Sequence, residues 1–273
     1  MKTTKEKTIK FLNMLLNAFL YVRHRILLMH GIGRSHLEGV RMIKKSKYQA
    51  QKFFRASDFY VTDLQNWGSA RPDTDHACSA DNAELNDRTV LIITERRDAV
   101  GRGWNAEKVE RHAVSGEAHT REPLEAVGMY SAFVKFDQHA IGSWDAFWFL
   151  HINDQESYEE FDIERMFAPH KRFNQLTASV HRGTTSEQDR RMFNFAVRIP
   201  KDFIHLAYEF RKKTMRIYVN GVCVFIALQH RVTTPIRMII GSGIGKGHLD
   251  YCDKIFRYEF KVFNIQHHRE IES

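Results

Sequence analysis

Short runs of apolar or alternating residues recur from about residue 48 to residue 265, and they constrain the fold more than any other feature of the chain. The segments between them are rich in turn residues, and no long segment with helical periodicity follows residue 48. The pair Asn220-Gly221 separates two of the runs and is a strong hairpin signal. We therefore expect an all-β fold, an antiparallel β-sandwich of jelly-roll type. The runs are Thr89–Thr94, Met129–Phe136, Trp144–Leu150, Phe193–Ile199, Met215–Val219, Val222–Ala227 and Arg257–Phe263.

The glycine-rich segment from Gly241 to Gly245 resembles a phosphate-binding loop only superficially. It lacks the pattern GxxxxGK[ST], and no helical pattern follows it. We expect it to form a loop of the sandwich. The 15 histidines include no HExxH pattern, and the three cysteines include no CxxC pair. The sequence therefore predicts no catalytic metal and no cofactor.

The basic residues are concentrated at the start of the chain. Residues 1–47 hold 11 lysines and arginines against two acidic residues, a formal charge of +9. The remaining residues hold 30 basic and 31 acidic side chains, a formal charge of −1. Because nucleic-acid binding depends on positive charge, we expect no nucleic-acid partner for the main part of the chain.

The basic segment contains an apolar run from Phe11 to Val22. Lysines followed by an apolar run are typical of a signal peptide, although no small-x-small cleavage site follows. A basic amphipathic helix on a membrane surface and a tail without fixed structure are the alternatives. No run reaches the roughly 20 apolar residues that span a bilayer. We expect two units, a basic N-terminal arm at 1–47 and a catalytic domain at 48–273, in a monomer that is secreted or periplasmic, with membrane association as a further option.

Three acidic residues alternate with apolar residues in the segment SYEEFDIERM, residues 157–166. Glu160, Asp162 and Glu164 would share one face of a strand, while Phe161 and Ile163 would face the core. Like charges this close raise the pKa of at least one member. The alternative is the solvated face of an edge strand, where lysine or threonine would be expected among the acids.

Two carboxyl groups on one face suit the hydrolysis of a glycosidic bond, which needs one ionised and one protonated carboxyl group. Retaining enzymes hold the two groups about 5–5.5 Å apart. Strand positions i and i+4 are about 13 Å apart at Cα, a gap that two long glutamate side chains on a curved strand can close. The intervening acid can share a proton with one of them.

These residues resemble the ExDxE signature of glycoside hydrolase family 16, the group of laminarinases, lichenases and agarases. The resemblance extends over roughly residues 48–265, through the segments GMYSAFVKF, GSWDAFWFL and HLAYEFRKKTMRIYVNGV. It implies a jelly roll with a concave substrate cleft, with Glu160 as nucleophile, Asp162 as helper and Glu164 as general acid/base. The short signature is similar to that of lichenases and xyloglucan transferases, which weakly favours a glucan-type substrate. Phe210, Asn220 and Asp145 depart from residues that are common in the family.

Six further residues are candidates for substrate binding. Trp144 and Trp148 fall on one strand face and could stack on sugar rings, although core packing is the alternative. The resemblance implies a cleft histidine at His181, and Tyr130 is a weaker candidate, as are Trp67 and Trp104 in loop-like sequence. The expected function is an endo-acting retaining glycosidase on a β-linked polysaccharide, either a β-glucan or a bacterial exopolysaccharide. A transglycosylase and a non-catalytic carbohydrate-binding jelly roll stay open as alternatives.

Overall fold

The computed structural model describes most of the chain. The described residues are 4–29, 35–44, 46–66, 68–72, 74–136, 142–152, 158–166, 175–183, 188–195, 203–228, 236–252 and 256–271. The α-helices are α1 (Thr4–Met29) and α2 (His36–Lys44), and single 3-10 turns occur at Ala56–Asp58, Ala80–Asn82 and Leu249–Tyr251. The strands are β1 (Tyr48–Phe53), β2 (Phe59–Val61), β3 (Ala77–Cys78), β4 (Ala83–Asn86), β5 (Thr89–Glu95), β6 (Ala99–Arg102), β7 (Lys108–Arg111), β8 (Val114–Ser115), β9 (Glu117–Thr120), β10 (Gly128–Phe136), β11 (Ser143–Ile152), β12 (Tyr158–Met166), β13 (Gln175–Gly183), β14 (Gln188–Phe195), β15 (Ile204–Arg211), β16 (Thr214–Val219), β17 (Val222–Leu228), β18 (Arg237–Ile244) and β19 (Arg257–Glu270).

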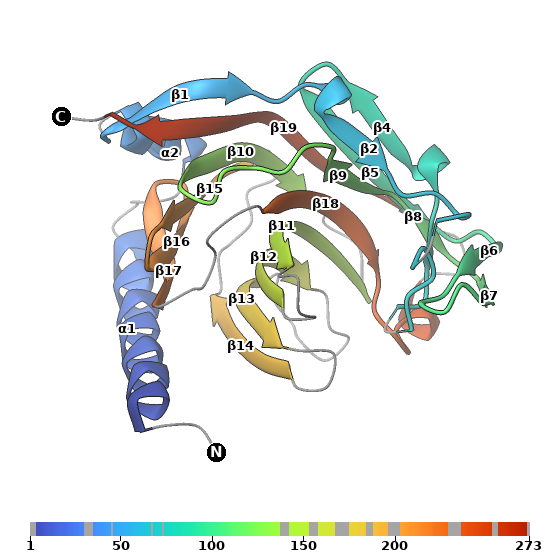
Figure 1. The fold of residues 1–273 in the computed structure, drawn as a ribbon, viewed down its shortest axis with the longest axis horizontal. Helices are drawn as coiled ribbons and strands as arrows, with labels where there is room; N and C mark the ends of the chain where they lie inside the picture. Colours follow the sequence, from blue (N-terminus) through green and yellow to red (C-terminus); the bar gives the residue numbers. More distant parts are fainter. Residues whose placement is uncertain are drawn as a thin grey trace.

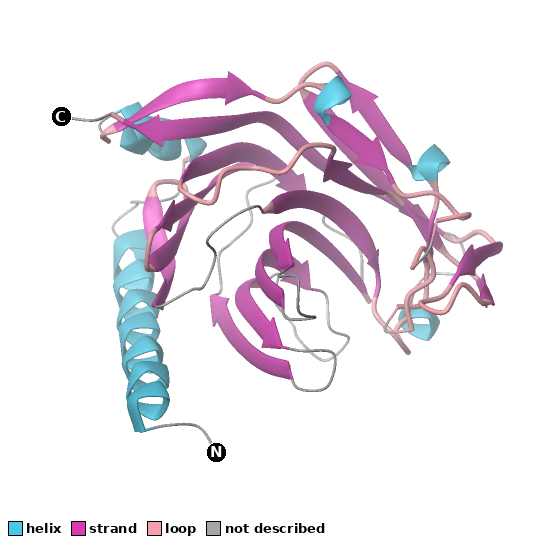
Figure 2. Ribbon diagram, in the orientation of Figure 1, coloured by secondary structure: helices cyan, strands magenta, loops and turns pink. Residues whose placement is uncertain are grey.

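Two large sheets make up the body of the molecule (Figures 1 and 2). The ten-stranded sheet follows the order β17-β16-β15-β10-β19-β5-β8-β3, with β1 paired to β19 and β4 to β5. The seven-stranded sheet follows the order β14-β13-β12-β11-β18-β9-β2. Among the described pairs only β3 and β8 run parallel. The prediction of an antiparallel β-sandwich is confirmed.

The core lies between the two sheets and consists mainly of aromatic and branched side chains. Phe147, Phe149, Phe161 and Ile163 of the seven-stranded sheet are fully buried, as is Phe210 of the opposite sheet. They occupy alternate strand positions, so the apolar periodicity of the sequence determines which face of each strand is inside. The acidic positions of β12 consequently lie on the face away from the core.

Most of the predicted strands coincide with observed ones. Six of the seven apolar runs fall on β5, β10, β11, β16, β17 and β19, and the seventh is described only as far as Phe195, the end of β14. The hairpin between β16 and β17 is also confirmed. Asn220 and Gly221 have φ angles of 47° and 80°, the left-handed pair that a type I′ turn requires.

The glycine-rich segment was expected to be a loop, and that prediction is wrong. Residues 241–244 belong to strand β18, where Gly241 pairs with Ala146 and Gly243 pairs with Trp144 of β11. A Cβ atom at Gly243 would lie 2.0 Å from Cε1 of His76, so the glycine makes room for that ring. Glycine within a strand often marks such a close approach.

The N-terminal helix α1 lies along the edge strand β17 (Figure 1). Asn17 donates to the carbonyl of Ile226 at 2.8 Å and accepts from its N–H at 2.9 Å, while Asn13 accepts from the N–H of Leu228 at 3.0 Å. The asparagines thus bind the backbone groups that an edge strand leaves exposed. Among the described residues, no helix combines the length and apolar character needed to cross a membrane.

Candidate active site

Strand β12 occupies a central position in the seven-stranded sheet, between β11 and β13. Its pairing with both neighbours continues without a register shift from Tyr158 to Met166, so the strand contains no bulge. Glu160, Asp162 and Glu164 therefore share one face, as the sequence predicted. We call this side of the sheet, opposite the core, the acid face.

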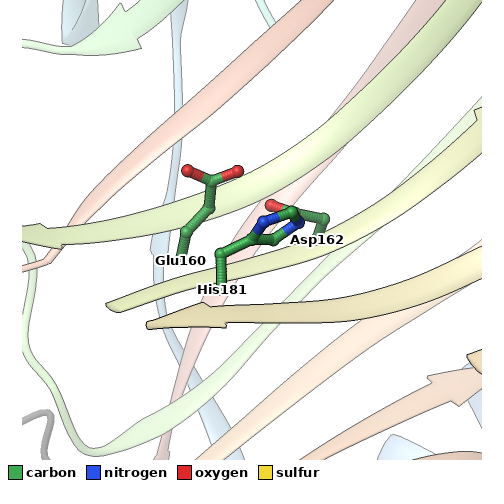
Figure 3. Close-up of side chains that lie close together, drawn as sticks. All are labelled: Glu160, Asp162 and His181. Carbon is green, nitrogen blue, oxygen red and sulfur yellow. The ribbon is translucent and has the colours of Figure 1, made fainter. Parts of the chain in front are cut away.

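Asp162 is the most enclosed of the three acids, with only 1% of its surface exposed. The hydroxyl of Ser179, directly opposite on β13, donates to Oδ2 of Asp162 at 2.9 Å. Nε2 of His181 lies 3.0 Å from the same oxygen and 3.3 Å from the hydroxyl of Ser179. Figure 3 shows the ring of His181 beside Asp162, with the carboxyl group of Glu160 on the same side of the strands.

Glu160 lies in an environment that disfavours its ionised form. Burial raises the pKa of Glu160 well above its usual range, and the negative charges of Asp162 and Glu164 raise it further. The positive charges of His181 and Arg71 act in the opposite direction without cancelling the increase. The cluster therefore retains a proton at a pH where an isolated glutamate would have lost it.

The same groups form a set of donor atoms that could in principle hold a cation. A carboxylate oxygen from each of Glu160 and Asp162 and one ring nitrogen of His181 all lie within 4.8 Å of one another. However, Nε2 of His181 already lies within hydrogen-bond distance of Asp162 and Ser179. We interpret the group as a proton-sharing cluster, and the absence of a catalytic metal stays a prediction.

The predicted tryptophans lie on the acid face next to the acids. Trp148 is directly opposite Asp162 in the pairing of β11 with β12, and Ala146 is opposite Glu164. Trp144 and Trp148 belong to an apolar cluster on this face that also includes Ile239. Trp144 is partly exposed, whereas Trp148 is only 8% exposed and packs within this cluster. The packing alternative therefore stays open, and the role of both rings in sugar binding stays a prediction.

Tyr130 was expected to contact substrate, and the structure corrects this. It belongs to β10 of the opposite sheet and has no exposed surface. Its ring lies in the core beside Phe149, and its hydroxyl donates to the carbonyl of Glu125 at 2.7 Å. Of the weaker candidates, Trp104 is 46% exposed in the turn between β6 and β7, and Trp67 lies outside the described residues.

A second polar group on the acid face was not predicted from the sequence. Glu117 of β9 lies opposite Gly241, which in turn lies opposite Ala146, so Glu117 shares the face of the three acids. Its carboxylate is 2.8 Å from Nη2 of Arg71 and 2.9 Å from Nε2 of His119. Burial alone would raise the pKa of Glu117, but the charge of Arg71 and the hydrogen bond from His119 outweigh it and hold the pKa below its usual range. The alternation Glu117-Ala118-His119 was the available sequence signal, and it was too short to stand out.

We compared the chain with known protein families, curated proteins and solved structures, and its fold is similar to that of several solved structures. No protein-family model matches the chain, and no curated protein matches it. The fold is similar to the laminarinase catalytic domain from Thermotoga maritima MSB8, with a TM-score of 0.64 and 14% identity, covering 83% of this chain and all of the other. It is similar to the κ-carrageenase from Pseudoalteromonas carrageenovora, with a TM-score of 0.62 and 15% identity over 83% of this chain and 94% of that chain. A lichenase derived from a mouse hindgut metagenome has a TM-score of 0.59 and 15% identity, covering 82% of this chain and 98% of that one.

The three structures are those of a laminarinase, a carrageenase and a lichenase, and at least 94% of each of them aligns with this chain. At such low identity the similarity concerns the fold alone. The chain has the jelly-roll β-sandwich that the resemblance to glycoside hydrolase family 16 implied.

Proposed function

We propose that this chain is an endo-acting, retaining glycosidase that cleaves a β-linked polysaccharide through a covalent glycosyl-enzyme intermediate. The observation that carries the proposal is the alignment of Glu160, Asp162 and Glu164 on one face of an unbulged central strand. Two glutamates that flank a hydrogen-bonded aspartate meet the need for one ionised and one protonated carboxyl group. The similarity in fold to endo-glucanases, a lichenase and a carrageenase gives independent support.

In the proposed first step, the carboxylate of Glu160 attacks the anomeric carbon while Glu164 protonates the departing glycosidic oxygen. In the second step, Glu164 accepts a proton from water, and the resulting hydroxide displaces Glu160 from the sugar. Glu160 must be ionised to attack, yet its surroundings favour its protonated form. We infer that Asp162 and His181 keep the displaced proton within the cluster, because strongly interacting groups titrate as a set.

The acid face also offers groups for holding a sugar chain. The partly exposed ring of Trp144 supplies aromatic surface beside the acids, next to the buried ring of Trp148, and apolar sugar faces pack on such rings. Glu117 and His119 lie on the same face two strands beyond β11, with charged and hydrogen-bonding atoms suited to sugar hydroxyls. We propose a β-glucan or a bacterial exopolysaccharide as substrate.

The test is a screen of the purified full chain against mixed-linkage glucan, laminarin, xyloglucan, galactans, carrageenans and bacterial exopolysaccharides. We expect new reducing ends and oligosaccharides of intermediate length from at least one of them. Glu160→Gln should lower that activity by about 10³-fold or more. Glu84→Gln, an exposed strand glutamate on β4, is the matched control and should be fully active. Binding to a glycan without any turnover would contradict the proposal and favour a carbohydrate-binding jelly roll.

A further inference from the structure

Helix α1 presents an apolar stripe to solvent. Phe11, Leu15, Phe19, Val22 and Ile26 follow one another at three- and four-residue spacing, which places them on one helix face. Their side chains are between 46% and 64% exposed. Leu12 and Met14, close to this face, are also about half exposed. A continuous exposed patch of this kind on a folded protein marks a contact surface.

The opposite face of the helix is fixed to the sandwich. Asn13, Asn17 and Leu20 are buried, and the two asparagines bind the backbone of β17. The helix therefore cannot rotate to bury its stripe against the domain without losing those hydrogen bonds. The stripe, as oriented, points away from the protein.

The basic residues that flank the stripe indicate the kind of surface that it contacts. At about 100° per residue, backbone positions 5 and 23 lie on one side of the stripe and positions 7 and 25 on the other, and all four are lysine or arginine. Arg23 is exposed. Residues 1–47 carry a formal charge of +9, whereas the remainder carries −1. A second copy of the same helix would bring these positive charges together, which opposes dimerisation through this face.

An apolar helix face bordered by basic residues fits the surface of a bilayer that contains anionic lipids. The apolar side chains enter the boundary between head groups and acyl chains, and each nearby lysine or arginine adds attraction to the negative surface. We propose that α1 attaches this protein to an anionic membrane surface, lying in the plane of the bilayer with the stripe of Phe11, Leu15, Phe19, Val22 and Ile26 inserted. This inference does not depend on the proposed catalytic activity.

Sedimentation of the full chain with large unilamellar vesicles tests the proposal. Vesicles of phosphatidylcholine with about one-third phosphatidylglycerol should bind the protein at least about tenfold more tightly than pure phosphatidylcholine vesicles, because several basic residues contribute. Raising the salt concentration to 0.5 M, on the order of three times the physiological value, should weaken binding, since salt screens the attraction between basic residues and anionic lipids. The triple variant Phe11→Gln, Leu15→Gln, Phe19→Gln should lose at least about tenfold in affinity for the anionic vesicles.

The matched control is Val100→Gln, Val127→Gln, Ile271→Gln, three exposed apolar residues away from α1. It should bind as the unchanged protein does. Glutamine is a good helix former, and the three control residues are exposed, so thermal melting should show that both variants stay folded. Failure to sediment with anionic vesicles, or equal binding by the stripe variant, would overturn the proposal. Self-association of the unchanged protein in light scattering, abolished in the stripe variant and without vesicle binding, would instead assign the stripe to a second copy.

Discussion

Glu160 has to satisfy two opposing demands. The proposed role of nucleophile requires an ionised carboxylate, whereas burial and two neighbouring carboxylates raise the pKa of Glu160. The raised pKa means that ionising this group costs more in the folded than in the unfolded protein. Under the proposed function, the cluster would therefore lower folding stability in order to place a reactive carboxyl group.

The pH dependence of activity should move in opposite directions in two variants. Asp162→Asn removes a negative charge beside Glu160, so the pKa of Glu160 falls and the acidic limb of kcat/KM shifts to lower pH. His181→Ala removes a charge that favours the ionised form, so the same limb shifts to higher pH. Full pH profiles of both variants on one soluble glycan provide the measurement. Shifts of equal sign would show that at least one of the two residues does not act on Glu160 through its charge.

The role of Glu164 can be tested with substrates that differ in their leaving group. If it donates the proton, Glu164→Ala should slow cleavage of natural glycan by about 10²–10⁴-fold. Aryl glycosides with acidic phenols need no proton to depart, so their glycosylation step should lose far less. Single-turnover rates on both kinds of substrate, with and without azide as an external nucleophile, separate the two steps. An equal loss on both substrates in that first step would contradict the role of acid/base.

At the scale of elements, alternation alone was sufficient to predict the face of β12. Phe161 and Ile163 mark one side and the three acids the other, because the side-chain period of a strand is two. The partners from other strands could not be predicted in this way. Ser179 lies opposite Asp162 because of the register between β12 and β13. Glu117 lies on the acid face because β9 pairs with β18. Such pairings join segments far apart in sequence.

The ring of Phe161 lies on the core side of β12 and is fully buried beside Phe210. Phe161→Ala should lower the free energy of unfolding by about 3–5 kcal/mol, through lost burial and the cavity left behind. Phe53→Ala on β1 is the control, since that ring is 42% exposed, and should cost less than about 1 kcal/mol. Urea unfolding followed by tryptophan fluorescence measures both. Similar losses would show that the ring is not part of a well-packed core.

The contact of α1 with β17 should stabilise the sandwich. Asn17→Ala removes hydrogen bonds to both backbone groups of Ile226 and should lower the free energy of unfolding by about 1–3 kcal/mol. It should also increase aggregation, because the edge of β17 becomes available for pairing. Met14→Ala, an exposed residue on the same helix, should change neither property. An unchanged urea midpoint in Asn17→Ala would show that the helix does not contribute through these bonds.

At the scale of the whole molecule, the sequence predicted the fold class well. It predicted less well in which sheet a residue lies and against which element a segment packs. Strand-like runs and the Asn220-Gly221 turn predicted the sandwich correctly, since both are local properties. Tyr130 was misplaced because its strand, β10, lies in the other sheet, a fact that depends on long-range pairing. The basic segment was predicted as an arm separate from the domain, whereas Asn13 and Asn17 bind it to β17. The boundary at residues 47 and 48 stays a prediction.

The central claim is that Glu160 and Glu164 act as nucleophile and acid/base in a retaining mechanism. The direct measurement is proton NMR of the anomeric signals during the first minutes of cleavage of a β-glycan, before the new reducing end mutarotates. The proposal predicts that the β-anomer forms first and the α-anomer appears later. An α-anomer formed first would mean inversion, and it would exclude Glu160 as the nucleophile.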